Sequence, residues 1–381
     1  MLKGFETHTA RGGADAGKPF VRSSLWIFVR GKSATQTLPA VAQQSRIQRL
    51  AAVVFEPVES AVFSGQGAAN EVEVRIGAEN RCIPQENPQE RFEHVNLQLF
   101  GTTQSAAGQQ STMQGFVVSY ADKHPDRGAE FMECYTPDQL PAFSALAHNF
   151  AISGAWYASV STQTWPNRAF FHTGTSMGQV DDYPYDPFAY DAPTIFNVLQ
   201  SQKISWAVYN DSHITSSTRL ESPPLWDLLL EPHFQNLEAF EKDARAGNLP
   251  AYSFLEPDFL VEPNDAHPPH DMLLADRLIW RVWQAVSSGA NWEGTLLLIT
   301  YDEHGGCVDH QPPPYGAAPP DDCRGPNGFA FDRFGVRVPM IAVSPWIEEG
   351  TVFARRRTRH TITRRSWPLC VIGWTSRATR C

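Results

Sequence analysis

Residues 295–306 read TLLLITYDEHGG, a continuous apolar run that leads directly into two acidic residues and a pair of glycines. The apolar run, residues 295–300, shows no alternation of polar and apolar side chains, which is typical of a strand buried on both faces. The stretch before it, residues 271–287, carries apolar side chains at helical spacing and is predicted to form an amphipathic helix. A helix next to a doubly buried strand indicates an α/β protein with a parallel sheet.

Other segments of the chain fit the same architecture. Helical spacing and short apolar runs predict strands at residues 47–55, 204–209, 251–255 and 336–343, and helices at residues 139–150, 193–200 and 238–247. The sequence therefore predicts an α/β fold with a central, mostly parallel sheet flanked by helices. We place this domain at residues 47–353, after a poorly ordered segment at 1–46 and before an atypical tail at 354–381.

The charge of the chain is unevenly distributed. The 381 residues are 42% hydrophobic and carry a formal net charge of −10. Residues 354–381 hold eight arginines and no acidic residue, so the rest of the chain has 23 basic against 41 acidic side chains. An acidic body of this kind excludes a general nucleic-acid binder, which needs clustered Lys and Arg. No apolar stretch approaches the roughly 20 residues of a membrane span, so we expect no integral membrane segment.

The acidic residues that follow the buried strand are the first candidate site. Asp302 and Glu303 come at its carboxyl end, which is where open α/β sheets bind their ligands. Gly305 and Gly306 follow and allow another backbone to approach closely. Adjacent carboxylates in such a place suit a hard or borderline metal cation. The alternative is a surface turn with incidental acidic residues.

A hydroxyl and an amide make the second candidate site, in residues 162–168 (TQTWPNR). Thr164 is expected at a junction between a loop and a helix, where the helix dipole and free backbone N–H groups favour an anion. Asn167 and Arg168 would add donors, although a threonine at such a place is more often a helix cap. His267, held between Ala266 and Pro268, is a candidate phosphate or metal group.

Together these segments resemble a known family. The segments are HVNLQLFGT from His94, the stretch at 135–176 that contains TQTWPNR, LPAYSFLEP, DAHPP, WEGTLLLITYDEHGGCVDHQPPP, and FDRFGVRVPMIAVSPWIEEGTV ending at Val352. Their order and spacing resemble the phosphoesterase family of bacterial phospholipases C of the non-haemolytic type, which also includes acid phosphatases. The resemblance implies an alkaline-phosphatase-like α/β fold and cleavage of phosphate mono- or diesters by a hydroxyl nucleophile on a metal.

The resemblance also implies roles for individual residues. Thr164 matches the nucleophile and a metal ligand, and the acidic pair Asp302 and Glu303 matches the other metal-binding residues together with Glu56. The groups that hold the phosphoryl oxygens or otherwise serve catalysis are Asn167, His267, His94 and His233. The implied cofactor is one divalent metal ion (Ca, Mg, Mn or Zn), and the implied partner is a phosphate-ester substrate, with phospholipid among the candidates. Such chemistry needs a hydroxyl of lowered pKa and donors for the phosphoryl oxygens.

The sequence departs from the family pattern after Glu56. The family continues with E-N-R-S, whose Glu and Asn complete the metal site, whereas Pro57 follows Glu56 here and cannot supply the amide. A second reading of the chain is therefore a catalytically defective family member, with an incomplete metal site and at most the ability to bind phosphorylated ligands.

The arginine-rich tail is the second departure, because the family has a D-H-T-S segment and an amphipathic helix there. Codons can be chosen for residues 357–376 so that a reading one base earlier gives TDTPYDHTSILATLRDWLDI, which restores both features. Our hypothesis is a shift of reading frame near Arg355, and it fails if the gene's codons do not allow this reading. A tail translated in the wrong frame indicates neither a nucleic-acid partner nor an anionic membrane.

Overall fold

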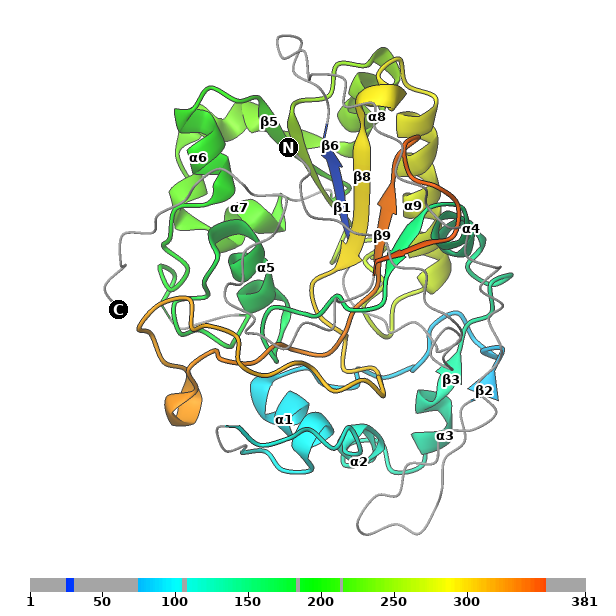
Figure 1. Cartoon of the computed structure of the whole chain (residues 1–381), viewed down its shortest axis with the longest axis vertical. Coiled ribbons are helices and arrows are strands. Elements are labelled where there is room, and N and C mark those ends of the chain that lie inside the picture. The colour runs from blue at the N-terminus through cyan, green and yellow to red at the C-terminus, as the bar shows by residue number, and fades with distance from the viewer. Residues whose placement is uncertain (1–24, 31–74, 105–107, 183–185, 213–214, 354–381) are drawn as a thin grey trace.

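An eight-stranded mixed sheet forms the centre of the protein in the computed structural model, which describes residues 25–30, 75–104, 108–182, 186–212 and 215–353 (Figure 1). The order of its strands is β10-β4-β9-β8-β1-β7-β5-β6. These strands are β1 (Leu25–Arg30), β4 (Ala151–Ser153), β5 (Trp206–Asn210), β6 (Phe234–Asn236), β7 (Tyr252–Glu256), β8 (Leu296–Tyr301), β9 (Met340–Val343) and β10 (Thr351–Phe353). A separate two-stranded sheet pairs β2 (Arg75–Ile76) with β3 (Glu133–Cys134).

Helices cover both faces of the large sheet. They are α4 (Pro141–Asn149), α5 (Thr164–Thr173), α6 (Ile195–Ser201), α7 (Ser217–Glu221), α8 (Leu237–Ala246) and α9 (Met272–Ser287). Helices α4, α8 and α9 lie on one side, and α5, α6 and α7 on the other (Figure 1). Three further helices, α1 (Phe92–Phe100), α2 (Phe116–Ala121) and α3 (Gly128–Phe131), lie beyond the end of the sheet toward which β8 points (Figure 1).

The helix and strand that the sequence predicted most clearly are confirmed as α9 and β8. Asp271 begins α9 as its N-cap, because its carboxylate accepts a hydrogen bond from the backbone N–H of Leu273 at 2.8 Å. In β8, Leu297 and Ile299 pack into the core under α4, α8 and α9, whereas Leu298 packs on the opposite face. Both faces of the strand are therefore buried, as the unbroken apolar run indicated.

The predicted α/β class is confirmed, but the pairing of strands is less parallel than expected. Six of the eight strands run in one direction, while β1 and β9 run in the other. Because β1 and β9 each lie between two strands of opposite direction, four of the seven neighbouring pairs are antiparallel. Both neighbours of β8 are antiparallel to it, since an apolar run reports burial on two faces and carries no information about direction.

Strand β1 lies within the segment at 1–46 that the sequence suggested to be poorly ordered. The rest of that segment, the strand predicted at 47–55 and the tail at 354–381 lie outside the described residues. Among the described helices, none combines the length and the apolar character needed to cross a bilayer.

Candidate active site

The carboxyl ends of β5, β7 and β8 meet at one edge of the sheet. Strands β5 and β7 are parallel, and β1 pairs antiparallel with both β7 and β8, so these three strands point the same way. Strand β7 ends at Glu256, and β8 ends at Tyr301, directly before Asp302 and Glu303. The prediction that the acidic pair follows a buried strand at this edge is confirmed.

Both acidic side chains are buried, and their environment disfavours a pair of negative charges. Burial raises the pKa of Asp302 to about 7, although nearby Arg168 opposes the shift. Burial and the adjacent Asp302 carboxylate also raise the pKa of Glu303. Each acid keeps one buried oxygen, Oδ2 of Asp302 and Oε1 of Glu303, that has no hydrogen-bond partner among the described residues. Buried carboxylate oxygens without a donor are what a cation would satisfy.

These two carboxylates fit a hard or borderline divalent cation by their chemistry. Among the described residues, no group of three or more His, Cys, Asp or Glu side chains is arranged to hold a metal ion. The further predicted ligand Glu56 lies outside the described part of the chain. The metal therefore stays a prediction, with Asp302, Glu303 and Thr164 as the described residues that would hold it.

The glycine pair after the acids brings in a segment that the sequence did not connect to the site. Gly306 has a φ of 71°, and a Cβ placed on it would lie 2.7 Å from the carbonyl oxygen of Gln89 and 2.8 Å from Cβ of Pro88. Only glycine allows this approach. The close packing holds Glu90, the next residue, beside the loop that carries Glu303.

Helix α5 begins at Thr164, as the sequence predicted. The backbone N–H of Trp165 donates to Oδ1 of Asp182 at 2.7 Å, and Pro166 lies in the first turn, where its missing N–H costs nothing. Burial raises the pKa of Asp182 to about 7, while its bond to Trp165 opposes the shift. Thr164 therefore lies at the positive end of the helix, with buried acidic groups around that end.

Asn167 is engaged with the loop that precedes its own helix. Its Nδ2 group lies within hydrogen-bond distance of the carbonyl oxygens of Val160 (3.2 Å), Thr162 (2.9 Å) and Gln163 (2.9 Å), and its Oδ1 accepts from the N–H of Val160 at 3.0 Å. The predicted contact with phosphoryl oxygens would have to replace one of these bonds. In this structure Asn167 instead fixes the loop that leads to Thr164.

Arg168, one helical turn after Thr164, lies in a buried ionic network. Its Nε donates to Glu221 at 2.9 Å, and its Nη2 contacts both Glu256 and the hydroxyl of Thr218, the latter at 2.6 Å. Arg168, Glu221 and Glu256 are all buried. The network ties α5 to α7 and to the end of β7, so it fixes the helix that carries Thr164.

Two of the three predicted histidines lie near the acidic residues. The Nε2 atom of His267 is 3.9 Å from Oε1 of Glu90, and its Nδ1 atom is 2.7 Å from the carbonyl oxygen of Pro268. His94 lies on α1, one turn before Gln98, whose side chain contacts Nε2 of His304 at 2.8 Å. The Nδ1 atom of His94 is buried and has no hydrogen-bond partner among the described residues.

The third histidine, His233, lies elsewhere. Its ring stacks on Trp206 with ring centroids 4.0 Å apart, and its Nδ1 atom is 2.8 Å from the carbonyl oxygen of Trp206. Trp206 begins β5, so His233 lies at the amino end of that strand, whereas the acidic pair lies at the carboxyl edge. The structure therefore does not bring His233 to the acidic pair, and its catalytic role stays a prediction, because a lone histidine motif carries no information about the end of the sheet to which it folds.

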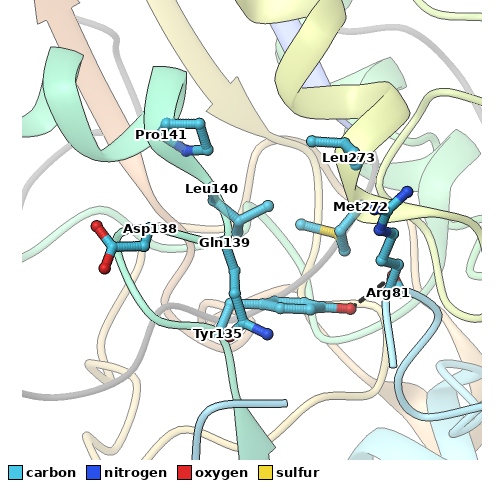
Figure 2. A pocket seen from close by; sticks show the side chains of 8 residues that line it. All are labelled: Arg81, Tyr135, Asp138, Gln139, Leu140, Pro141, Met272 and Leu273. Carbon is cyan, nitrogen blue, oxygen red and sulfur yellow. Dashed lines mark hydrogen bonds between the residues drawn. The ribbon is translucent and has the colours of Figure 1, made fainter. Parts of the chain in front are cut away.

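A cavity of about 370 Å³ opens at the beginnings of α4 and α9 (Figure 2). Its wall is formed by Arg81, Tyr135, Asp138, Gln139, Leu140, Pro141, Met272 and Leu273. The Tyr135 hydroxyl donates to the carbonyl oxygen of Arg81 at 2.7 Å across one side of it (Figure 2). The wall includes none of the predicted site residues, so the candidate chemistry belongs to the carboxyl edge of the sheet and not to this cavity.

The sequence reading missed two acidic residues near the predicted site, Glu90 and Asp182. Glu90 comes shortly before α1, and Asp182 follows α5 by nine residues. Neither lies in a local pattern that marks a site. A search for acids close to Gly-rich or Pro-rich turns would have included Glu90 among many others, and only the fold selects it.

The fold and this group of residues define an α/β protein with buried acids and a helix N-terminus at the carboxyl edge of its sheet. The chain belongs to the phosphoesterase family: the sequence profile described as "Phosphoesterase family" matches residues 57–362. This match confirms the resemblance that the motifs indicated.

Three relatives illustrate the similarity. The chain is 36% identical to non-specific phospholipase C6 of Arabidopsis thaliana over 71% of its own length and 53% of that protein. It is 38% identical to non-specific phospholipase C5 of the same plant, over 64% and 48% of the two lengths. It is 28% identical to phospholipase C A of Mycobacterium tuberculosis, over 56% and 47%. The chain spans about half the length of these relatives. Because two of them come from a plant, the expectation of a specifically bacterial type is not borne out.

Proposed function

We propose that this protein hydrolyses phosphate esters at the carboxyl edge of its sheet, with Thr164 as the nucleophile. The observation that carries the proposal is the pair of buried acids, Asp302 and Glu303, each with an oxygen that lacks a donor among the described residues, beside the helix that begins at Thr164. The family membership and the names of the relatives support the same activity. The alkaline-phosphatase-like fold of the family is part of this proposal.

In the proposed reaction, the hydroxyl oxygen of Thr164 attacks phosphorus. A bond forms between this oxygen and phosphorus as the hydroxyl loses its proton to solvent, the ester P–O bond breaks, and the leaving oxygen takes a proton from solvent. Water then cleaves the phosphothreonine and releases the phosphate group. The N-terminal end of α5 offers its positive dipole to the phosphoryl oxygens, and His267 adds a donor.

Asp302 and Glu303 would hold a divalent cation, with Thr164 and the predicted Glu56. When bound, such a cation supplies a Lewis acid that lowers the pKa of the threonine hydroxyl and offsets charge on the phosphoryl oxygens. Because the acids are buried, the same residues without a cation hold protons near neutral pH, which agrees with the raised pKa of Asp302.

The first experiment measures turnover of p-nitrophenyl phosphate and p-nitrophenyl phosphorylcholine by the full chain. We expect activity with at least one of Ca²⁺, Mg²⁺, Mn²⁺ or Zn²⁺, a loss of about 100-fold or more after chelation, and recovery when the metal returns. A heat-treated sample of the same protein serves as the control. If neither ester is cleaved under any condition and metal binds weakly at most, the chain is the catalytically defective member.

The proposed substrate class is phospholipid, as in the names of the relatives, and one surface of the protein supports it. Leu228 and Leu229 are 80% and 81% exposed. Trp226, two residues before Leu228, is also exposed, and its ring lies against the exposed ring of Phe188 with ring centroids 5.6 Å apart. Two residues after Phe188, Tyr190 packs edge-to-face on Trp165, the residue that follows the nucleophile. Apolar side chains exposed in this way suit contact with a lipid surface.

Replacing both Leu228 and Leu229 with serine is therefore expected to lower activity on phosphatidylcholine vesicles about 10-fold or more, since roughly 1 kcal/mol or more is lost for each leucine withdrawn from lipid. Hydrolysis of soluble p-nitrophenyl phosphorylcholine is expected to stay unchanged. Vesicle sedimentation measures the binding directly. Equal loss on both substrates, or no loss on vesicles, would contradict a lipid-contacting role for these leucines.

A further inference from the structure

Glu90 is a buried acid with no role in the function proposed so far. It lies in the segment that packs on Gly306, and only 8% of the residue is exposed. Its Oε1 atom is 3.9 Å from Nε2 of His267 and receives a long hydrogen bond of 3.4 Å from the side chain of Gln163. Its Oε2 atom is buried and has no hydrogen-bond partner among the described residues. A carboxylate in such a place needs a cationic neighbour.

The hydrogen bond that Nδ1 of His267 makes decides which ring nitrogen carries the hydrogen in the neutral form. The Nδ1 atom lies 2.7 Å from the carbonyl oxygen of Pro268. A carbonyl oxygen can only accept, so Nδ1 must carry the hydrogen. In a neutral ring, Nε2 would then direct a lone pair at the Glu90 carboxylate, which is repulsive. A proton on Nε2 turns this repulsion into attraction, so the geometry favours the imidazolium form.

We propose that Glu90 is a positioning residue that keeps His267 protonated and oriented, so that its Nε2–H group serves as a charged donor to a phosphoryl oxygen of the substrate. The inference rests on the proposed function. At 3.9 Å the Glu90–His267 pair is an ion pair without a hydrogen bond, so the Nε2–H remains available to a ligand that enters the site. A charged donor is about twice as strong as a neutral one.

Other charged groups act on His267 from several elements. Asp265 and His270 belong to its own loop, Asp302 and His304 follow β8, and Asp182 follows α5. Burial lowers the pKa of His267. The negative charges of Glu90, Asp265 and Asp302, in this order of strength, oppose the effect of burial, and the pKa is raised overall. Glu90 is the strongest of these opposing charges. A cation held by Asp302 would lower this pKa in every variant, so comparison of variants isolates the effect of Glu90.

The test replaces Glu90 with glutamine, which keeps the shape and removes the charge. We expect the pKa of His267, followed by NMR of ¹³C-labelled histidine in metal-free buffer and assigned with His267→Asn, to fall by about 1 to 3 units. The alkaline limb of the pH profile of kcat/KM is expected to move to lower pH by the same amount. Glu93→Gln is the matched control, because Glu93 is exposed in the first turn of α1. It should leave both measurements unchanged.

A folded Glu90→Gln protein in which the pKa of His267 is unchanged overturns the inference. A shift in the alkaline limb of the kcat/KM profile without a shift in the pKa of His267 overturns it as well. Glu90→Asp keeps the charge and shortens its reach, so its pKa shift should lie between those of the wild type and the glutamine variant. An aspartate variant as shifted as the glutamine variant also contradicts the inference, and this comparison remains if Glu90→Gln does not fold. The NMR titration needs no turnover. Failure of the proposed function, seen as inactivity of the wild type, is therefore distinguishable from failure of the inference about Glu90, seen as an unchanged pKa of His267.

Discussion

Replacing Thr164 with alanine is expected to lower kcat for phosphate-ester hydrolysis by at least about 10⁴-fold, because the hydroxyl that attacks phosphorus is removed. Thr164 begins α5, whose N-terminal end carries the positive end of the helix dipole. This dipole remains in the variant, as do the acids Asp302 and Glu303. Binding of inorganic phosphate, measured by calorimetry, is therefore expected to change by less than about threefold, since the helix terminus is intact.

Two control variants make the result specific. Thr164→Ser retains a hydroxyl and is expected to keep measurable turnover. Thr173→Ala makes the same change at the other end of the same helix, where the hydroxyl bonds the carbonyl oxygen of Ala169 at 2.9 Å, and should leave kcat within about threefold of the wild type. A Thr164→Ala protein that retains more than about one hundredth of the activity would exclude Thr164 as the nucleophile.

The elements that the sequence predicted well are those with a strong local pattern. Residues 271–287 were expected to be helical and form α9, because apolar side chains at helical spacing are a local signal. The acidic pair was placed at the carboxyl end of a buried strand for the same reason. The direction of the strands beside β8 was not predictable, because burial on both faces looks the same in parallel and antiparallel neighbours.

Residues that depend on contacts distant in sequence escaped prediction. Asn167 was assigned to phosphoryl oxygens, but its hydrogen bonds to residues 160–163 depend on how the loop folds back over the start of α5. Glu90 and His267 are far apart in the sequence, and their contact depends on the close packing of Gly306 on the segment before α1. Local pattern therefore identifies candidate chemistry, while long-range packing decides which of the candidates meet.

Replacing Arg168 with methionine is expected to destabilise the fold by about 3–5 kcal/mol, the usual cost of removing one partner from a buried ionic network. Arg168 is fully buried between Glu221 and Glu256. Without the guanidinium, both carboxyl groups remain buried and lose the charged donor that Arg168 supplies. Denaturant unfolding followed by circular dichroism measures the loss. Arg127→Met is the matched control, because Arg127 and its partner Glu86 have side chains that are 41% and 48% exposed, and such surface pairs contribute about 1 kcal/mol or less.

The dependence of this loss on pH identifies its cause. Burial already raises the pKa of Glu221 to about 8 in the wild type, with Arg168 opposing the shift, so removing Arg168 raises it further. A carboxyl group with a raised pKa in the folded state stabilises the fold at low pH, and this stability is lost as the pH rises through the folded-state pKa. Below about pH 8, Glu221 is protonated in the folded state of both proteins, so the Arg168→Met protein should be less destabilised at pH 7 than at pH 10. A destabilisation that is equal at both values would mean that the packing of the side chain, rather than its charge, holds α5 in place.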